Sequence, residues 1–283
     1  MPYIDWSPFF YTWGLMMKYP KIFDDENIGA EAKKIYDDAQ LMIEKFKADG
    51  RIRPRGVVGL FPAASLHEDI IVYTDETRTA EKDRIIGLRQ QLVREGGKPN
   101  YSLADFIAGV DSCTPDYIGV FAVTSGDGLE QIVKEYESGH DTYGAMMAKA
   151  VADRFAEAFA EYLHERVRRD FWGYAPSENL NIDTLIAEEY QGIRPAPGYP
   201  ANPDHTQKLA IWRLLDVEKN TGIQLTESLA MWPASSVSGF YFSHPDSYYL
   251  SIHTIGRDQL EDYARRRGID VAEAERWLAP VLD

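Results

Sequence analysis

The feature that most restricts the fold of this chain is a proline-rich segment over residues 191–206. It reads Gln-Gly-Ile-Arg-Pro-Ala-Pro-Gly-Tyr-Pro-Ala-Asn-Pro-Asp-His-Thr. Each proline fixes φ at about −65° and removes a backbone donor, which excludes a helix interior and a central strand. The prolines are Pro195, Pro197, Pro200 and Pro203. We therefore expect a rigid, extended loop.

Three residues of this loop suit the binding of a ligand. Arg194 offers a planar fork of donors that fits a carboxylate or a phosphate. Gly198 lets the backbone approach a ligand closely, beside the ring of Tyr199. On these residues alone, a binding loop and an ordinary rigid connector remain alternatives.

Helical and strand patterns alternate irregularly along the chain. Apolar residues at helical spacing predict helices over residues 30–46, 142–169, 206–220, 258–267 and 271–278. Runs of β-branched and aromatic residues predict strands over 56–61, 69–73, 117–124, 236–242 and 248–255, the last two as a hairpin. Because the βαβ rhythm is missing, the pattern favours the α+β class. No repeat or flexible linker interrupts it, so we expect one domain over residues 1–283.

Composition excludes several classes of function. The net charge of −15 argues against nucleic acid as a partner, because phosphate binding needs clustered Lys and Arg. No apolar run reaches about 18 residues and the N-terminus has no signal pattern, so we expect no membrane segment and a cytoplasmic protein. The single cysteine, Cys113, excludes intramolecular disulfides. The six histidines lack zinc-site spacing, so we expect no metal site.

Sequence motifs in order along nearly the whole chain are shared with one family. They are Tyr3-Ile-Asp-Trp-Ser-Pro-Phe-Phe, Arg53-Pro-Arg-Gly-Val-Val-Gly-Leu-Phe-Pro, Asp75-Glu-Thr-Arg, Ala156-Glu-Ala-Phe-Ala-Glu-Tyr-Leu-His-Glu, Trp172-Gly-Tyr-Ala-Pro, Met231-Trp-Pro, Ser236-Val-Ser-Gly-Phe-Tyr-Phe-Ser-His-Pro and Arg257-Asp-Gln-Leu-Glu-Asp-Tyr-Ala-Arg-Arg. In the proline-rich loop, Arg194, Gly198 and Tyr199 match an Arg-x-x-x-Gly-Tyr signature. With these motifs the chain resembles the S-adenosylmethionine-binding activation domain of cobalamin-dependent methionine synthase. The resemblance implies a single compact domain with a central twisted antiparallel sheet and surrounding helices.

The resemblance also implies roles for charged residues. Arg194 would take the carboxylate of S-adenosylmethionine, and Asp5 would take a cationic group. Glu157 and Glu188 would lie near the sulfonium, where two carboxylates stabilise a bound cation. From the residues alone, Asp5 is typical of a helix cap and Glu157 of a solvated carboxylate. Glu189 should point elsewhere and serves as an internal control.

Other site residues implied by the family surround the nucleoside. Ala196, Gly198 and Tyr199 belong to the binding loop, and Tyr199 would also face the cobalamin. Tyr249 would contact the nucleoside from the last strand of the predicted hairpin. The chain departs from many relatives at two positions. Leu250 replaces a second aromatic residue, and Asn202 stands where relatives often carry a cysteine.

The function implied is the reactivation of methionine synthase in methionine biosynthesis. Bound S-adenosylmethionine would supply the methyl group for reductive methylation of cob(II)alamin, and a flavodoxin or diflavin reductase would supply the electron. The cobalamin would be presented by a partner domain, because this chain has no Asp-x-His-x-x-Gly motif of its own. We expect either an excised part of the enzyme or the free subunit of a split one. Because flavodoxins are usually acidic, docking would need a basic patch such as Arg166, Arg168 and Arg169.

Two other functions remain open from sequence. One is a free-standing S-adenosylmethionine-binding regulator without a cobalamin partner. The other is a hydrolase that uses Glu157 and Glu188 as a carboxylate pair, for which no further motif speaks.

Overall fold

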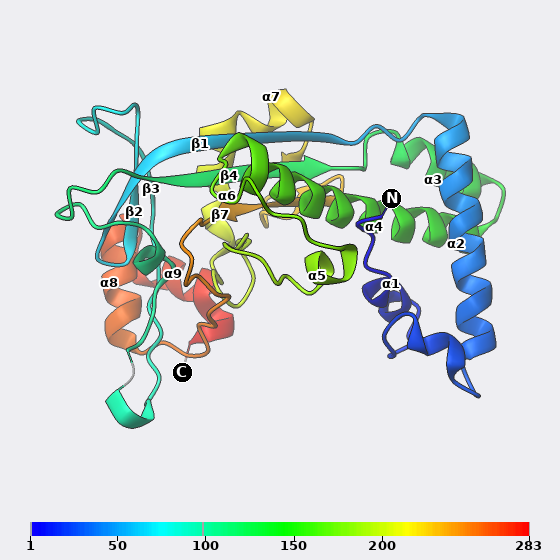
Figure 1. The fold of residues 1–283 in the computed structure, drawn as a ribbon, viewed down its shortest axis with the longest axis horizontal. Coiled ribbons are helices and arrows are strands. Elements are labelled where there is room, and N and C mark those ends of the chain that lie inside the picture. The colour runs from blue at the N-terminus through cyan, green and yellow to red at the C-terminus, as the bar shows by residue number, and fades with distance from the viewer. Residues whose placement is uncertain (1, 98, 283) are drawn as a thin grey trace.

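A five-stranded sheet lies at the centre of the molecule, with strand order β3-β2-β1-β4-β7 (Figure 1). The strands are β1 (Arg55–Leu66), β2 (Asp69–Tyr73), β3 (Glu81–Ile85), β4 (Asp116–Thr124) and β7 (Ser236–Tyr241). Every neighbouring pair in this sheet is antiparallel. A small separate sheet pairs β5 (Gln224–Leu225) with β6 (Met231–Trp232). The computed structural model describes residues 2–97 and 99–282.

Helices surround the central sheet. They are α1 (Ser7–Thr12), α2 (Gly29–Asp49), α3 (Leu129–Ser138), α4 (Thr142–Arg166), α5 (Ile182–Ile186), α6 (Lys208–Leu215), α7 (Val217–Thr221), α8 (Arg257–Arg267) and α9 (Val271–Leu278). This arrangement confirms the α+β class and the central antiparallel sheet.

Strands β4 and β7 lie between two apolar layers, and their successive side chains point alternately into one layer and the other. Val120 and Phe240 are buried in one layer with residues of α6, α7, α8 and α9. Phe121 and Tyr241 are buried in the other with residues of α4. The separation follows from the two-residue period of a strand, which sends successive side chains to opposite faces.

Helix α4 connects two of the apolar clusters. Its first half packs with α1, α2 and α3, where Met147 and Val151 are buried. Its second half lies against the sheet, where Leu163 is buried. The helix begins after Asp141, whose side chain accepts a hydrogen bond from the backbone N–H of Gly144 at 2.7 Å. Because α4 spans both clusters, it fixes its polar side chains relative to the sheet.

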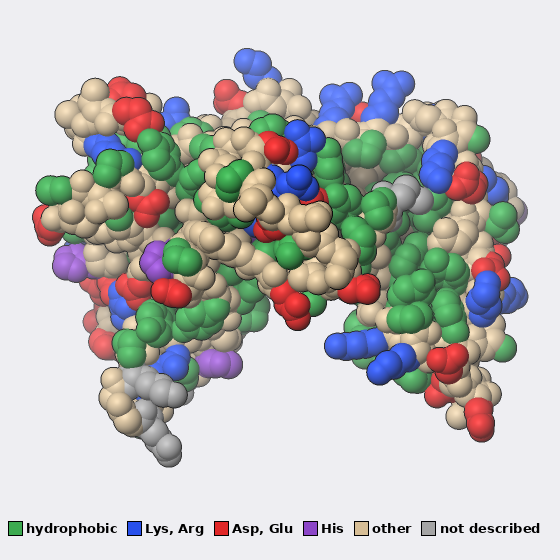
Figure 2. All heavy atoms as spheres, in the orientation of Figure 1, with side chains coloured by type: hydrophobic (Ala, Val, Ile, Leu, Met, Phe, Trp, Pro, Cys, Tyr) green, Lys and Arg blue, Asp and Glu red, His purple; other side chains and the backbone are tan. Residues whose placement is uncertain are grey.

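The molecule is elongated, with α2 at one end and α8 and α9 at the other (Figure 1). The space-filling view shows that its lower side is hollowed between these two ends (Figure 2). Helix α5 lies between the ends, on the same lower side of the sheet. Over the residues that the structure describes, no helix combines the length and apolar character needed to cross a bilayer.

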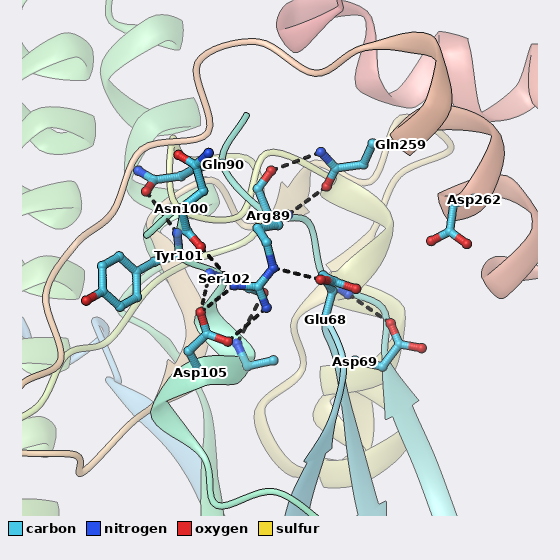
Figure 3. Close-up of polar contacts among 12 residues, drawn as sticks. Glu68, Asp69, Arg89, Gln90, Asn100, Tyr101, Ser102, Asp105, Gln259 and Asp262 are labelled. Atoms are coloured by element: carbon cyan, nitrogen blue, oxygen red, sulfur yellow. Dashed lines mark hydrogen bonds and ion pairs between the residues drawn. The ribbon is translucent and has the colours of Figure 1, made fainter. Parts of the chain in front are cut away.

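A polar cluster ties α8 to the sheet (Figure 3). The Arg89 guanidinium pairs with both oxygens of Asp105 and donates through Nε to Glu68 at 2.7 Å. The Gln259 side chain of α8 bonds both the N–H and the C=O of Arg89, at 2.7 and 2.9 Å. On the same helix, Arg266 pairs with Asp69 at the start of β2. These contacts hold the C-terminal helices against the β1–β2 turn.

The predicted strand over residues 248–255 was wrong. These residues form an extended loop, although Leu250 and Ile252 are each only 2% exposed. The edge of β7 where a hairpin partner would pair is occupied by the proline-rich loop. Ile193 exchanges two backbone hydrogen bonds with Phe242, both of 3.0 Å, and Pro195 accepts one from Phe240. The apolar run therefore reflects burial and not strand pairing.

The predicted helix over residues 206–220 is broken. Asp216 adopts a left-handed conformation, with φ of 47°, and separates α6 from α7. Gly222 ends α7 with φ of 81°, two residues beyond the predicted end of the helix. Strand β3 and helix α3 were not predicted. The helix over 142–169 also differs at its end, where residues Val167–Phe171 form a π-helical turn.

Candidate functional site

The proline-rich loop lies along β7 because two glycines remove side chains from the contact. A Cβ at Gly239 of β7 would lie 2.7 Å from the carbonyl oxygen of Pro195. A Cβ at Gly192 would lie 2.6 Å from the carbonyl oxygen of Phe242, and φ there is +89°. The backbone of the loop can therefore approach the strand as closely as another strand would.

The loop reverses direction around Gly198. Its φ is +95°, and a Cβ would lie 2.1 Å from the His205 ring, so glycine is required here on both counts. The reversal is held by backbone hydrogen bonds from Gly198 to Asn202 at 2.7 Å and from Asn202 to Tyr199 at 2.9 Å. Tyr199 donates its own N–H to the carbonyl of Ala196 at 3.3 Å. The turn presents the Tyr199 side chain to solvent, with 62% of the residue exposed.

Arg194, at the head of the loop, is surrounded by polar partners. Its Nη2 lies 2.8 Å from Glu161 of α4 and 3.0 Å from Glu188. Its Nη1 donates to the Tyr190 hydroxyl and lies 3.5 Å from Nδ1 of His164. The Arg194 side chain is only 15% exposed. A charge this well buried needs such partners, because an unpaired one would be costly.

Burial sets the protonation of the groups around Arg194. It raises the pKa of Glu161, while the positive charges of Arg194 and Arg168 oppose that rise. It lowers the pKa of His164 well below 6.5, and the same two arginines lower it further. His164 is therefore neutral at pH 7, and its Nδ1 is placed to accept from Arg194.

Glu157 and Tyr249 belong to the same region. Glu157 lies on α4 one turn before Glu161 and is half-buried. Burial raises its pKa, the negative charge of Glu188 adds to the rise, and the positive charge of Arg194 opposes it. The Tyr249 hydroxyl accepts a hydrogen bond from the backbone N–H of Arg194 at 3.1 Å, and burial raises its pKa to about 12. The predicted solvated position of Glu157 was thus wrong.

Tyr199 also lies in this region. Although the residue is 62% exposed, the burial of its remaining surface raises the pKa of its hydroxyl, and the charge of Glu157 raises it further. Glu188 and Tyr249 thus contact Arg194 directly, and the charge of Arg194 acts on Glu157. Tyr199 is linked to the charge of Glu157, while Ala196 and Gly198 contribute to the loop turn that carries it. Glu189 is exposed, and within the described residues no ion pair joins it to Arg194.

Asp5 is not joined to this group by a polar contact. Its carboxylate accepts a hydrogen bond from the N–H of Ser7 at 2.9 Å, at the start of α1. Within the described residues, no hydrogen bond or ion pair connects it to the other candidates. Its neighbour Tyr3 nevertheless packs on α4, edge-on to the ring of Tyr162 at 5.4 Å.

Sequence reasoning missed three residues that touch Arg194. They are Glu161, His164 and Tyr190. One signal was present, since Glu161 follows Glu157 by four residues and so lies on the same helix face. No sequence motif around His164 indicated a role in the site. This residue contacts Arg194 only because the fold places α4 beside the loop.

The prediction of a basic docking patch at Arg166, Arg168 and Arg169 was wrong, most clearly for Arg168. Arg168 is completely buried, pairs with Glu178 at 2.7 Å and lies over the Tyr190 ring at 3.7 Å. Arg166 and Arg169 are each paired with an acidic residue one turn away on the helix. The three arginines therefore form no shared positive surface.

Two grooves lie apart from Arg194. One, of about 970 Å³, is lined by residues that include Met146, Lys149, Trp232 and Pro233. The other, of about 470 Å³, lies between Tyr3, Phe46 and Phe159. In the described part of the chain, no three His, Cys, Asp or Glu side chains are grouped to hold a metal ion.

The chemistry of the Arg194 region favours a zwitterionic or cationic ligand. A guanidinium is present for a carboxylate, and Glu157 and Glu188 are present for positive charge. The Tyr249 hydroxyl contacts the Arg194 backbone and the charge of Glu157 acts on Tyr199, and both residues have rings that suit a planar group.

Comparison with known proteins gives matches that cover nearly the whole chain. A family model described as vitamin B12 dependent methionine synthase, activation domain, matches residues 1–268. A solved structure described as the MetH reactivation domain bound to AdoHcy is 58% identical, with a TM-score of 0.96. That match covers 99% of this chain and 86% of the other.

Proposed function

This chain belongs to the family of activation domains of vitamin B12-dependent methionine synthases, and from this membership we propose that it binds S-adenosylmethionine around Arg194. The bound ligand supplies its methyl group to cobalamin held by another domain. The chain is then one part of a methyltransferase, and we propose that its domain spans residues 1–283. The observation that carries the proposal is the buried Arg194 with its acidic and aromatic surroundings, in a chain 58% identical to a domain solved with AdoHcy.

The site residues match the chemical groups of S-adenosylmethionine. The ligand carboxylate pairs with Arg194, and the sulfonium lies near Glu157 and Glu188. Asp5 takes the ammonium, for which its carboxylate has acceptor capacity beyond the one hydrogen bond from Ser7. The adenosine lies against the loop backbone at Ala196 and Gly198 and against the rings of Tyr199 and Tyr249.

The methyl transfer needs no nucleophile from this chain. An electron from a flavodoxin or a diflavin reductase reduces the cob(II)alamin of the partner domain, and the reduced cobalt takes the methyl as the S–CH₃ bond breaks. The bonding electrons of S–CH₃ stay on sulfur, so S-adenosylhomocysteine leaves as a neutral thioether. The contribution of this chain is proximity, because it fixes the sulfonium methyl toward the acceptor.

The exposed ring of Tyr199 marks the side that faces the cobalamin-binding domain. It is 62% exposed although the loop beneath it is tightly held. The proposed partners place the chain in the cytoplasm. Family membership disfavours a free-standing regulator, and nothing in the geometry favours a hydrolase.

Calorimetric titration with S-adenosylmethionine tests the proposal. We expect saturable binding by the wild type, and for Arg194→Ala a loss of about tenfold to a hundredfold in affinity, because a charge-assisted contact is removed. Glu189→Gln is the matched control and should bind as the wild type does. If Arg194→Ala bound the ligand with unchanged affinity, the site would lie elsewhere.

When binding is established, the second step adds a partner domain loaded with cob(II)alamin and a reduced flavodoxin. We expect the absorbance spectrum to change to that of methylcobalamin only when S-adenosylmethionine is present. Binding without any spectral change would favour the regulator.

A further inference from the structure

The two carboxylates that hold Arg194 differ in how firmly they are placed. Glu161 lies within α4 and its side chain is 7% exposed. Glu188 follows α5 in a turn, adopts φ of 57°, and its side chain is 37% exposed. A left-handed conformation is strained for a residue other than glycine. Because its side chain is more exposed and can be solvated, Glu188 can leave the guanidinium at lower cost than Glu161.

Both Nη groups of Arg194 already face protein partners. An arginine carries about five N–H groups, and Nη1 is directed at Tyr190 and His164. Nη2 is directed at Glu161 and Glu188, at 2.8 and 3.0 Å. A ligand carboxylate that arrived without displacing a partner would place three negative groups around one guanidinium. If the ligand carboxylate replaces one of the two at Nη2, the guanidinium keeps the same number of acidic partners.

Glu161 has the capacity to hold Arg194 through this exchange. Its Oε2 makes the ion pair, while Oε1 is buried and has no hydrogen-bond partner among the described residues. A buried acceptor without a partner is destabilising, so it is available to a second N–H of the guanidinium. A bidentate pair of this kind would fix the plane of Arg194.

We infer that Glu161 is a positioning residue that holds Arg194 permanently, and that Glu188 is an exchangeable partner. When the ligand carboxylate takes the N–H of Nη2, Glu188 is released and faces the sulfonium. The inference rests on the proposed binding of S-adenosylmethionine. It explains why an acid at the sulfonium contacts the arginine when the ligand is absent.

The test of Glu161 compares S-adenosylmethionine with its decarboxylated form, which keeps the sulfonium but lacks the carboxylate. In Glu161→Gln we expect affinity for the complete ligand to fall about tenfold or more, and affinity for the decarboxylated ligand to change less than about threefold. An equal loss for both ligands would make Glu161 a merely structural residue and overturn this part. Glu161→Asp, which keeps the charge, should recover part of the preference, and circular dichroism establishes that each variant is folded.

The test of Glu188 compares S-adenosylmethionine with S-adenosylhomocysteine, which has no sulfonium. In Glu188→Gln we expect S-adenosylmethionine to bind about tenfold more weakly, while S-adenosylhomocysteine binds equally well or more tightly because its competitor at Arg194 is gone. An equal loss for both ligands would overturn the exchange. Glu189→Gln again serves as the control. If the wild type bound neither ligand, the proposed function itself would fail. Failure of the function can therefore be distinguished from failure of the exchange at Arg194.

Discussion

Single residues decide the chemistry of the site through burial and charge. Arg194 is held by acids from two separate segments. His164 stays neutral because it is buried, and the charges of two guanidinium groups lower its pKa further. The sequence predicted Arg194, Gly198 and Tyr199 because they share one short loop. It did not predict Glu161 or His164, since about 30 residues separate α4 from the loop and only the fold joins them.

Glu157 gives a prediction about pH. Burial raises the pKa of this carboxyl above its ordinary value of 4.5, so it loses its charge at a higher pH than an exposed Glu would. A sulfonium is attracted only by the charged form. As the pH falls through that raised pKa, we expect the affinity for S-adenosylmethionine to fall toward that for S-adenosylhomocysteine.

The measurement is the ratio of the two affinities at a series of pH values, for the wild type and for Glu157→Gln. The variant should show a smaller ratio that depends less on pH, because the titrating group near the sulfonium has been removed. The ratio cancels pH effects that both ligands share. A wild-type ratio that rose on acidification would contradict the placement of Glu157.

At the scale of elements, the position of the proline-rich loop beside β7 determines the site. Sequence patterns predicted most strands and helices correctly because their apolar periods are local. They failed over residues 248–255, where Leu250, Ile252 and Ile255 are buried although the segment forms no strand. The proline-rich loop pairs with the edge of β7 instead. Its proline content did not indicate that it would lie along a strand. The break between α6 and α7 was also missed. Asp216 has a left-handed backbone there, and no glycine in the sequence indicated such a conformation.

The contact between the loop and β7 can be tested at Gly239. An added methyl group in Gly239→Ala would lie 2.7 Å from the Pro195 carbonyl oxygen, and so must push the loop away from the strand. We expect a loss of about 1–3 kcal/mol in the free energy of unfolding, as for other overpacked positions. Affinity for S-adenosylmethionine should fall too, because Arg194 follows the loop.

Chemical denaturation and calorimetry measure these two effects. The control is Gly139→Ala, at the end of α3, where the nearest atom to an added Cβ lies at 3.5 Å and φ is −81°. That variant should resemble the wild type in both measurements. A Gly239→Ala protein with full stability and full affinity would show that the close approach is not needed.

At the scale of the whole molecule, the sheet and α4 connect two ends that carry separate clusters of apolar residues. The site lies where the second half of α4 meets the sheet, away from both ends (Figure 1). The overall class was predictable from the mixture of elements. The hollow on the lower side could not be predicted from sequence (Figure 2). It forms because both ends of the molecule extend below the sheet (Figure 1).

The polar cluster around Arg89 should stabilise one end without affecting the site. Arg89→Met removes paired contacts to Glu68 and Asp105 that are about 70% buried, with side-chain exposures of 26% and 29%. We expect a loss of about 1–3 kcal/mol in the free energy of unfolding and faster amide exchange in α8. Affinity for S-adenosylmethionine should not change.

Arg257→Met is the control for this prediction. Arg257 also lies on α8 and pairs with two acids, but its side chain is 64% exposed, so the loss should be about 0.5 kcal/mol or less. If the two variants lost equal free energy of unfolding, the buried contacts of Arg89 would contribute no more to stability than an exposed ion pair does.

The prolines of the loop have a consequence for association between molecules. An open strand edge invites pairing with other chains, and β7 would be such an edge if nothing covered it. The loop covers it with a segment in which Pro195, Pro197 and Pro200 have no N–H to offer an incoming strand. The sheet therefore ends at the binding loop, and the segment that shapes the site also protects the molecule against edge-to-edge aggregation.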